Sequence, residues 1–225
     1  MRTNIEMSEY TNKRITKFWN YFTEHSALIR EYMLIDPDYD VLYEELIQKL
    51  NLISRRIDYA IQVNLTDETC KIIIIGHGYP KLVPKIKAVV EAAPIIPNWS
   101  VQALLQPLDH DELELVKQRL DKPVLFYDCE LRMSEITFKL LSYDMKTKKV
   151  NISVYLGDDY SIDSLGSTVI IWEFLLILLG EMTLRRNIKL TEFLETPQKN
   201  KLSPLYELPQ LIDSMYSNRG RRRVQ

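Results

Sequence analysis

The feature that most constrains the fold of this chain is the apolar stretch from Thr168 to Glu181, TVIIWEFLLILLGE. Only Glu173 interrupts its apolar side chains before Gly180. A helix that crosses a bilayer needs about 20 apolar residues, so this stretch is too short to do so. It predicts a helix buried in a globular core and covered on more than one side, by the final helix, by the amino-terminal helices or by a second subunit.

Hydrophobic periodicity predicts the remaining elements. Apolar residues spaced by three and four predict helices, and alternating ones predict strands. The helices are expected over residues 12–32, after the Asp36–Asp40 segment, over 82–93, within 106–123 and after Pro204. The strands are expected over residues 59–65, 71–75, 99–105, 136–140, 150–156 and 187–195, with a further short one at VLFYD.

The order strand, turn, strand, loop, helix, strand occurs twice, with hairpin turns at Thr66–Thr69 and Asp144–Lys148. Each second strand ends in a glycine loop, IIIIGHG and then SVYLGDD. We therefore expect an α+β fold with two layers, in which an internal duplication gives two ββαβ units after a helical hairpin. The sheet should be mainly antiparallel, with helices largely on one face. Six strands in two separate sheets would contradict the idea of one continuous sheet.

The expected domains follow from this order. Residues 1–107 would hold the helical hairpin and the first unit. Residues 108–218 would hold the second unit and the C-terminal helix, fused with the first part into one domain. Residues 219–225 would form a basic, disordered tail, because four of the seven are arginines and none is aromatic.

Charge and cysteine content limit the partners and the location. The formal net charge is −2, and the tail residues Arg219, Arg221, Arg222 and Arg223 leave −2 − 4 = −6 for the rest. An acidic body does not favour nucleic acid, so we expect such binding through the tail only. Two cysteines are too few for a disulfide framework, and the polar amino terminus lacks the apolar core of a signal peptide. We therefore expect a cytoplasmic protein.

The loop from Gly76 to Lys81 is the best candidate for a ligand site. His77 lies between Gly76 and Gly78 at the end of a predicted central strand, where ligands often bind in sheet proteins. Lys81 would attract an anion. The loop is neither a dinucleotide-binding nor a P-loop motif, and it has no nucleophile elbow. The structural alternative is a turn whose glycines adopt positive φ.

Two acidic segments are weaker candidates for a metal site. The loop before the apolar helix contains Asp158, Asp159 and Asp163, which are also the residues that a turn and a helix start require. The Asp36–Asp40 segment resembles the start of a calcium loop, but Val41 and Ile47 occupy the positions of its glycine and its glutamate. We expect neither a metal nor a cofactor.

Four short motifs stand out along the chain: FWNYF in the first helix, an isoleucine-rich strand ending in GHG, AAP before NWSVQALLQP, and a late LLGE. Together they resemble a family of uncharacterised bacterial cytosolic proteins. The resemblance spans most of residues 15–215 and implies a bacterial cytosolic α+β protein, with no activity or catalytic residues to transfer. The matching residues are Phe18, Trp19, Phe22, Gly76, Gly78, Ala92, Ala93, Pro94, Trp99, Leu179, Gly180 and Glu181.

These observations favour a non-enzymatic binding or regulatory protein that acts on a protein partner or associates with itself. An immunity-type inhibitor of a toxin is one form of such a protein, because an acidic body suits a basic partner such as a nuclease. The alternative is a small enzyme or ligand-binding domain that uses the Gly76–Lys81 loop.

Overall fold

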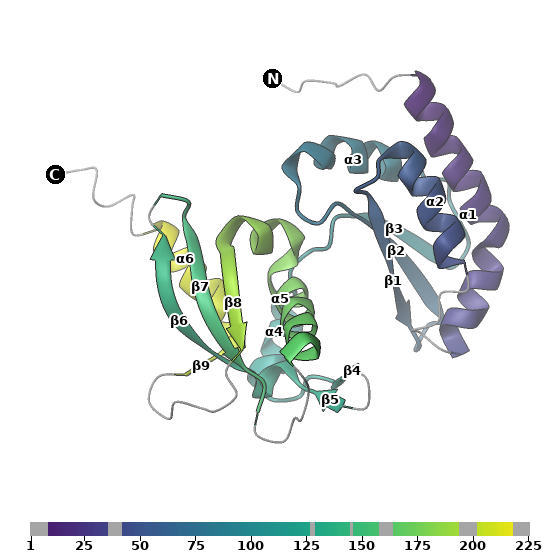
Figure 1. Cartoon of the computed structure of the whole chain (residues 1–225). Coiled ribbons are helices and arrows are strands. Elements are labelled where there is room, and N and C mark those ends of the chain that lie inside the picture. The colour runs from purple at the N-terminus through teal and green to yellow at the C-terminus, as the bar shows by residue number, and fades with distance from the viewer. Residues whose placement is uncertain are drawn as a thin grey trace. The chain divides into compact units, whose positions relative to one another are not determined.

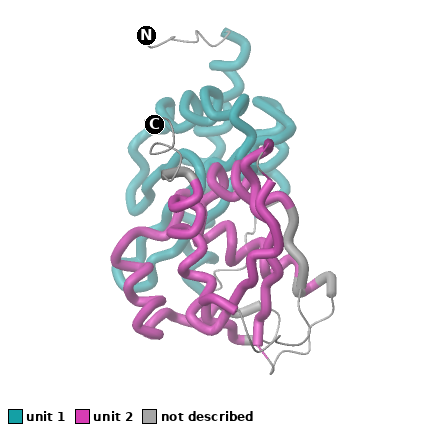
Figure 2. The backbone as a smooth tube through the Cα atoms, turned by 90° about the vertical axis from the view of Figure 1, so that its left-hand side faces the viewer, with its two compact units in different colours: residues 1–105 teal, residues 106–225 magenta. Residues whose placement is uncertain are grey.

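The computed structural model describes residues 9–35, 42–126, 129–144, 146–157, 164–193 and 202–217. The chain divides into two compact units, residues 1–105 and residues 106–225, coloured separately in Figure 2. Each unit has its own main sheet and its own hydrophobic core.

Unit 1 is a three-stranded sheet with its helices packed on one face (Figure 1). Strands β1 and β2 form an antiparallel hairpin, and α3 leads from β2 to β3, which is parallel to β2. Tyr59, Ile72 and Ile74 share one face of the sheet and join the core formed with the helices. The elements are α1 (Glu9–Ile35), α2 (Tyr43–Ile53), β1 (Asp58–Asn64), β2 (Thr69–Ile75), η1 (Pro80–Leu82), α3 (Val83–Glu91) and β3 (Trp99–Ala103).

An aromatic cluster holds α1 against the rest of unit 1. The rings of Trp19 and Phe22 lie edge to face at 5.7 Å, and Phe22 meets Trp99 of β3 in the same way at 4.9 Å. Both indoles are also hydrogen-bonded, since Trp19 Nε1 donates to the Val89 carbonyl at 2.7 Å and Trp99 Nε1 donates to the Ser26 carbonyl at 3.2 Å. Three elements, α1, α3 and β3, are thereby fixed to one another.

Unit 2 repeats the order of the first unit and adds elements around it. Strands β6 and β7 form an antiparallel hairpin, and α5 leads from β7 to the parallel strand β8. Strand β9 pairs with the other edge of β6, and β4 and β5 form a separate hairpin. The elements are α4 (His110–Lys117), β4 (Val124–Phe126), β5 (Cys129–Leu131), η2 (Met133–Glu135), β6 (Thr137–Asp144), β7 (Lys149–Tyr155), α5 (Ser164–Asn187), β8 (Ile188–Phe193), β9 (Ser203–Pro204), η3 (Leu205–Glu207) and α6 (Leu208–Ser217).

The apolar stretch forms most of α5. Phe174, Leu175 and Leu178 are buried in a core shared with β7 and α6, whereas Val169 and Trp172 remain 46% and 36% exposed. The final helix α6 therefore packs on part of this stretch, as expected, while Val169 and Trp172 stay partly exposed. No helix among the described residues is long and apolar enough to cross a membrane.

The two main hairpins close in the same way. Asn64 and Asp144 each end the first strand, and each side chain accepts a hydrogen bond from the backbone N–H two residues later. Glu68 and Lys148 each precede the second strand with positive φ, 54° and 61°. The expected α+β class and the mainly antiparallel pairing are confirmed. An origin by duplication stays a prediction.

The idea of one continuous sheet is wrong, because the strands of the two units lie in separate sheets. Strand β9 pairs with the outer edge of β6 at Thr137 and Phe138. Strand β3 ends where Leu104 adopts a φ of 65° and its N–H bonds to the Ile74 carbonyl.

Replacing Phe22 by alanine should lower the free energy of unfolding by about 3–5 kcal/mol, because Phe22 is fully buried in the aromatic cluster. Urea unfolding followed by circular dichroism measures this. Leu65→Ala is the control, since that side chain is 62% exposed and its loss should cost less than about 0.5 kcal/mol. Equal losses for the two variants would contradict the described packing.

Candidate functional site

The glycines of the Gly76–Lys81 loop have structural explanations. Gly76 is buried, and a Cβ built on it would lie 2.5 Å from Ile86 Cδ1 and 3.3 Å from Leu82 Cβ. A side chain at position 76 would therefore force the end of the Ile86 side chain on α3 to shift. Gly78 has a φ of 66°, which costs a residue with a Cβ about 1 kcal/mol or more.

His77 points into solvent beside a carboxylate that the sequence analysis did not associate with it. Its side chain is 55% exposed, and its Nε2 lies 3.6 Å from Asp58 Oδ2. The antiparallel register places Asp58 opposite Ile75, so the start of β1 meets the loop that follows β2. The distance exceeds that of a hydrogen bond, which leaves a weak, water-accessible charge contact.

Two cations and an aromatic ring complete the surroundings of this loop. Lys81 is exposed in η1, and the Arg56 guanidinium lies 4.9 Å from the centroid of the Tyr79 ring. Gly76, His77, Gly78 and Lys81 thus lie together by chain proximity. A surface depression of about 590 Å³ lies elsewhere, along the first turns of α1 and against Leu52, and no loop residue lines it.

The other sequence candidates provide no catalytic or metal centre within the described residues. Cys70 is a buried free thiol, and burial raises its pKa, which disfavours the reactive thiolate. No cluster of three or more His, Cys, Asp or Glu suitable for a metal occurs in the described part of the chain. Several candidates lie outside the described residues: Asp36, Asp38, Asp40, Asp158, Asp159, Asp163, Arg219, Arg221, Arg222 and Arg223.

Glu173, the single charge in the apolar stretch, faces solvent. The sequence predicts that this carboxylate either faces the polar edge of the helix or meets a partner such as an arginine. Among the described side chains no ion pair holds Glu173, and it is exposed. Desolvation by its surroundings on α5 still raises the pKa of its carboxyl. Its ionised form is therefore less favourable in the folded chain than in the unfolded one.

Helix α4 presents an exposed apolar end that the sequence analysis missed. The sequence predicts Asp109 or Asp111 as the cap of this helix and places Leu113, Val116 and Leu120 inward. Asp109 is the cap, in a capping box with Glu112, and Val116 is buried. Leu120 is instead 63% exposed, and Leu115 is 47% exposed. The reason is that α4 ends at Lys117, before Leu120 is reached.

A Schellman motif brings these two leucines together. Arg119 has a φ of 59° and its N–H bonds to the Val116 carbonyl, while the Leu120 N–H bonds back to the Leu115 carbonyl at 2.8 Å. A hydrophobic contact between the residues at these two positions frequently accompanies this motif. The sequence signal for this motif is the spacing of five residues between Leu115 and Leu120. The usual glycine is missing, because Arg119 occupies the position with positive φ.

Comparisons with protein-family models, with curated proteins and with solved structures give no match. The candidate sites are therefore judged on their geometry alone.

Replacing Gly76 by alanine should destabilise the chain by about 1–3 kcal/mol, because the new Cβ overlaps Ile86 Cδ1. Ile86→Val removes that atom and alone should cost about 0.5–1.5 kcal/mol. The double variant should lose clearly less than the sum of the two, as measured by urea unfolding. Strict additivity would show that Gly76 is not required for packing.

Replacing Glu173 by glutamine should raise the melting temperature at neutral pH. The raised pKa of Glu173 means that its ionisation destabilises the folded state, and glutamine cannot ionise. The advantage should shrink as the pH falls through the folded pKa and vanish below the unfolded pKa of glutamate. Calorimetry across this range tests the sign, and an advantage that grows toward low pH would contradict it.

Proposed function

We propose that this chain is a non-enzymatic binding protein whose α4 surface, Asp111, Glu112, Leu115 and Leu120, docks a basic protein partner. The observation that carries the proposal is that Leu115 and Leu120 are both exposed and are joined by a backbone hydrogen bond at the end of α4. Apolar anchors inside a polar rim are the usual form of a protein-binding site. The inward residues of α4, including Val116, pack in the core of unit 2, so the helix is a rigid support for this surface.

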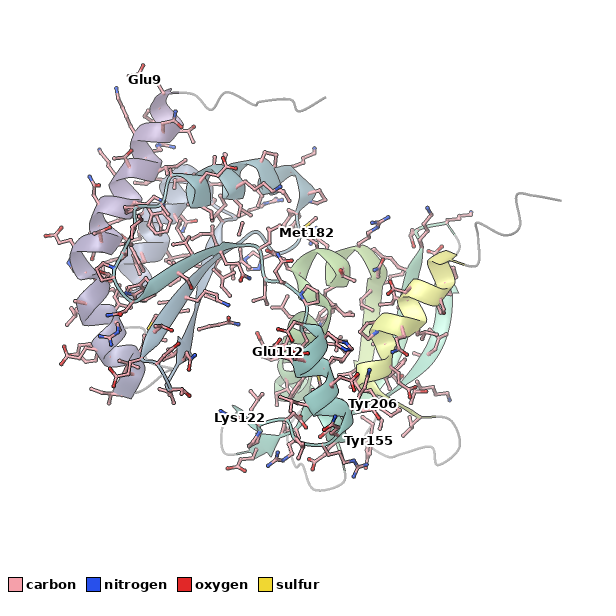
Figure 3. All side chains as sticks on the ribbon, turned by 180° about the vertical axis from the view of Figure 1, so that it is seen from behind. Glu9, Glu112, Lys122, Tyr155, Met182 and Tyr206 are labelled. Atoms are coloured by element: carbon pink, nitrogen blue, oxygen red, sulfur yellow. The ribbon has the colours of Figure 1, made fainter. Side chains whose placement is uncertain are left out.

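The charge around the leucines favours a basic partner. Four carboxylates and two cations lie between Asp109 and Leu120, so this segment has a net charge of 2 − 4 = −2. Asp111 and Glu112 are exposed in the first turn of α4, where Figure 3 labels Glu112. Charge complementarity speeds encounter and excludes acidic competitors. An immunity-type inhibitor of a basic enzyme such as a nuclease is the form of the proposal that we favour.

Two further observations support a binding protein rather than an enzyme. The glycines of the Gly76–Lys81 loop are explained by packing and by backbone conformation, which leaves little reason to assign them to a ligand. Cys70 is a free thiol, as is usual for proteins of the cytoplasm, and we place the protein there. The exposed pair of His77 and Asp58 is the observation that favours the rival, a small enzyme or ligand-binding domain.

Capture from the cells in which the chain is naturally expressed should recover one stoichiometric protein with a basic isoelectric point. The double variant Leu115→Ser, Leu120→Ser should lose it, because both apolar anchors are gone. Leu65→Ser is the matched control, since Leu65 is 62% exposed and lies in unit 1, and it should retain the partner.

The readout is mass spectrometry of the captured protein, with circular dichroism to show that each variant is folded. Recovery of no stoichiometric protein would overturn the proposal, as would retention by the double variant. Loss on His77→Ala, with retention by the leucine variant, would support the rival instead.

A further inference from the structure

Helix α1 is much longer than the helix it pairs with. It has 27 residues and α2 has 11, a difference of 27 − 11 = 16 residues, or roughly 24 Å at the α-helical rise. Figure 1 shows α1 extending past both ends of α2. The buried residues of α1 run from Ile15 to Met33, so the first six residues, Glu9–Arg14, contribute none. The described residues of unit 1 therefore bury little of the start of this helix.

A second stripe runs along α1, mostly on the side away from the core. Its edge nearest α2 contacts that helix, since Arg14 donates to the Leu52 carbonyl and the Lys49 ammonium lies 4.0 Å from the centroid of the half-buried Tyr21 ring. Its members alternate in spacing between four and three residues, the 3.5-residue repeat of helices that pair with other helices. The stripe lies roughly 140° around the helix from the buried residues, at 100° per residue. All members are exposed or half-buried, and the α1 stripe consists of Tyr10, Arg14, Lys17, Tyr21, Glu24, Leu28, Glu31 and Ile35.

The α1 stripe is complementary to itself when reversed. Its first half carries Arg14 and Lys17, and its second half carries Glu24 and Glu31. If two copies lie antiparallel with residue numbers that add to 45, Arg14 meets Glu31 twice and Tyr10 meets Ile35 twice. A parallel pair would instead put Arg14 against Arg14 and Glu31 against Glu31, which is repulsive. The antiparallel arrangement is the two-fold one that most homodimers adopt.

The first half of the stripe borders the open depression of about 590 Å³. Tyr10 and Leu52 offer apolar surface there, and the other lining residues are polar or charged, among them Arg14, Lys17 and Glu9, which Figure 3 labels. Arg14 is held in place there: it donates to the Tyr10 hydroxyl and to the Leu52 carbonyl, and its guanidinium lies 3.9 Å from the Tyr10 ring centroid.

The antiparallel register brings an apolar residue of the other copy to this depression. Ile35 is 77% exposed and Leu28 is 41% exposed, both in the second half of the stripe. The same register lays the aliphatic stem of Lys17 across Leu28 of the other copy. A single two-fold rotation therefore places the exposed Ile35 of each copy at the depression of the other copy.

We propose that two copies of this chain associate through the α1 stripe, antiparallel, with Ile35 of each copy seated in the depression at the start of the other's α1. The dimer contacts lie in unit 1, whereas the α4 surface proposed above for a protein partner lies in unit 2. The two proposals therefore stand or fall on different residues.

Sedimentation equilibrium of the full chain tests the proposal. The wild type should show a monomer–dimer equilibrium, weakened by salt because the Arg14–Glu31 contacts are exposed. Glu31→Arg and Arg14→Glu should each weaken the dimer by about tenfold, since each puts like charges together twice. The double variant Arg14→Glu, Glu31→Arg should regain most of the affinity, which only this pairing explains.

Two further variants guard against a local effect of changing Arg14, whose hydrogen bonds also hold the helix end. Ile35→Ser, which alters no core residue, should weaken the dimer by about tenfold. Leu65→Ser, an exposed leucine of the same unit, should leave it unchanged. The proposal is overturned if the wild type is monomeric at every concentration, if Ile35→Ser and Glu31→Arg dimerise as the wild type does, or if the charge-exchanged double variant is weaker than both single variants.

Discussion

The structure depends on one constraint that both units share: each sheet is built around a central strand that has one antiparallel and one parallel neighbour. Strand β2 pairs with β1 and β3, and β7 pairs with β6 and β8. A hairpin can supply the antiparallel neighbour, but a parallel neighbour requires a crossover. The crossover helix must then cover one face of the sheet, and for that reason α3 and α5 carry apolar faces.

Glycine enables both crossovers, but at different places. In unit 1 the absence of a side chain at Gly76 lets α3 approach β2 closely. In unit 2 Gly180 interrupts α5 with φ 66° and ψ 159°, so that the last segment of the helix can turn toward β8. The two units thus reach the same topology in different ways. Unit 1 uses close packing at Gly76 after β2, and unit 2 uses the break at Gly180 near the end of α5.

Much of this could be predicted from the sequence, because period and turn chemistry are local properties. Alternation in β1 and β7, the apolar run of β2 and the cap at Asp109 gave the elements and their order. Long-range pairing could not be predicted in the same way. The two residues of β9 have no period of their own, and only their position beside the first residues of β6 makes them a strand.

The candidate sites show the same division. The Gly76–Lys81 loop was found because its residues are consecutive, whereas Asp58 enters through the register of β1 with β2. Leu120 was placed inward because a helical period was continued past Lys117, where hydrogen bonds instead fold the chain back on Leu115. Whether a side chain such as Leu120 is exposed depends on where its helix ends, and the hydrophobic period does not specify that position.

The placement of the tryptophans has a spectroscopic consequence. Trp19 and Trp99 lie in the aromatic cluster of unit 1 with their indole N–H groups bonded to carbonyls, while Trp172, in unit 2, is 36% exposed. Indole emission moves to longer wavelength when the ring enters water, and the change is largest for a ring that starts out buried. The intrinsic fluorescence of this chain therefore follows the integrity of unit 1 much more closely than that of unit 2. Comparing it with far-ultraviolet dichroism, to which both units contribute, would distinguish loss of one unit from loss of both.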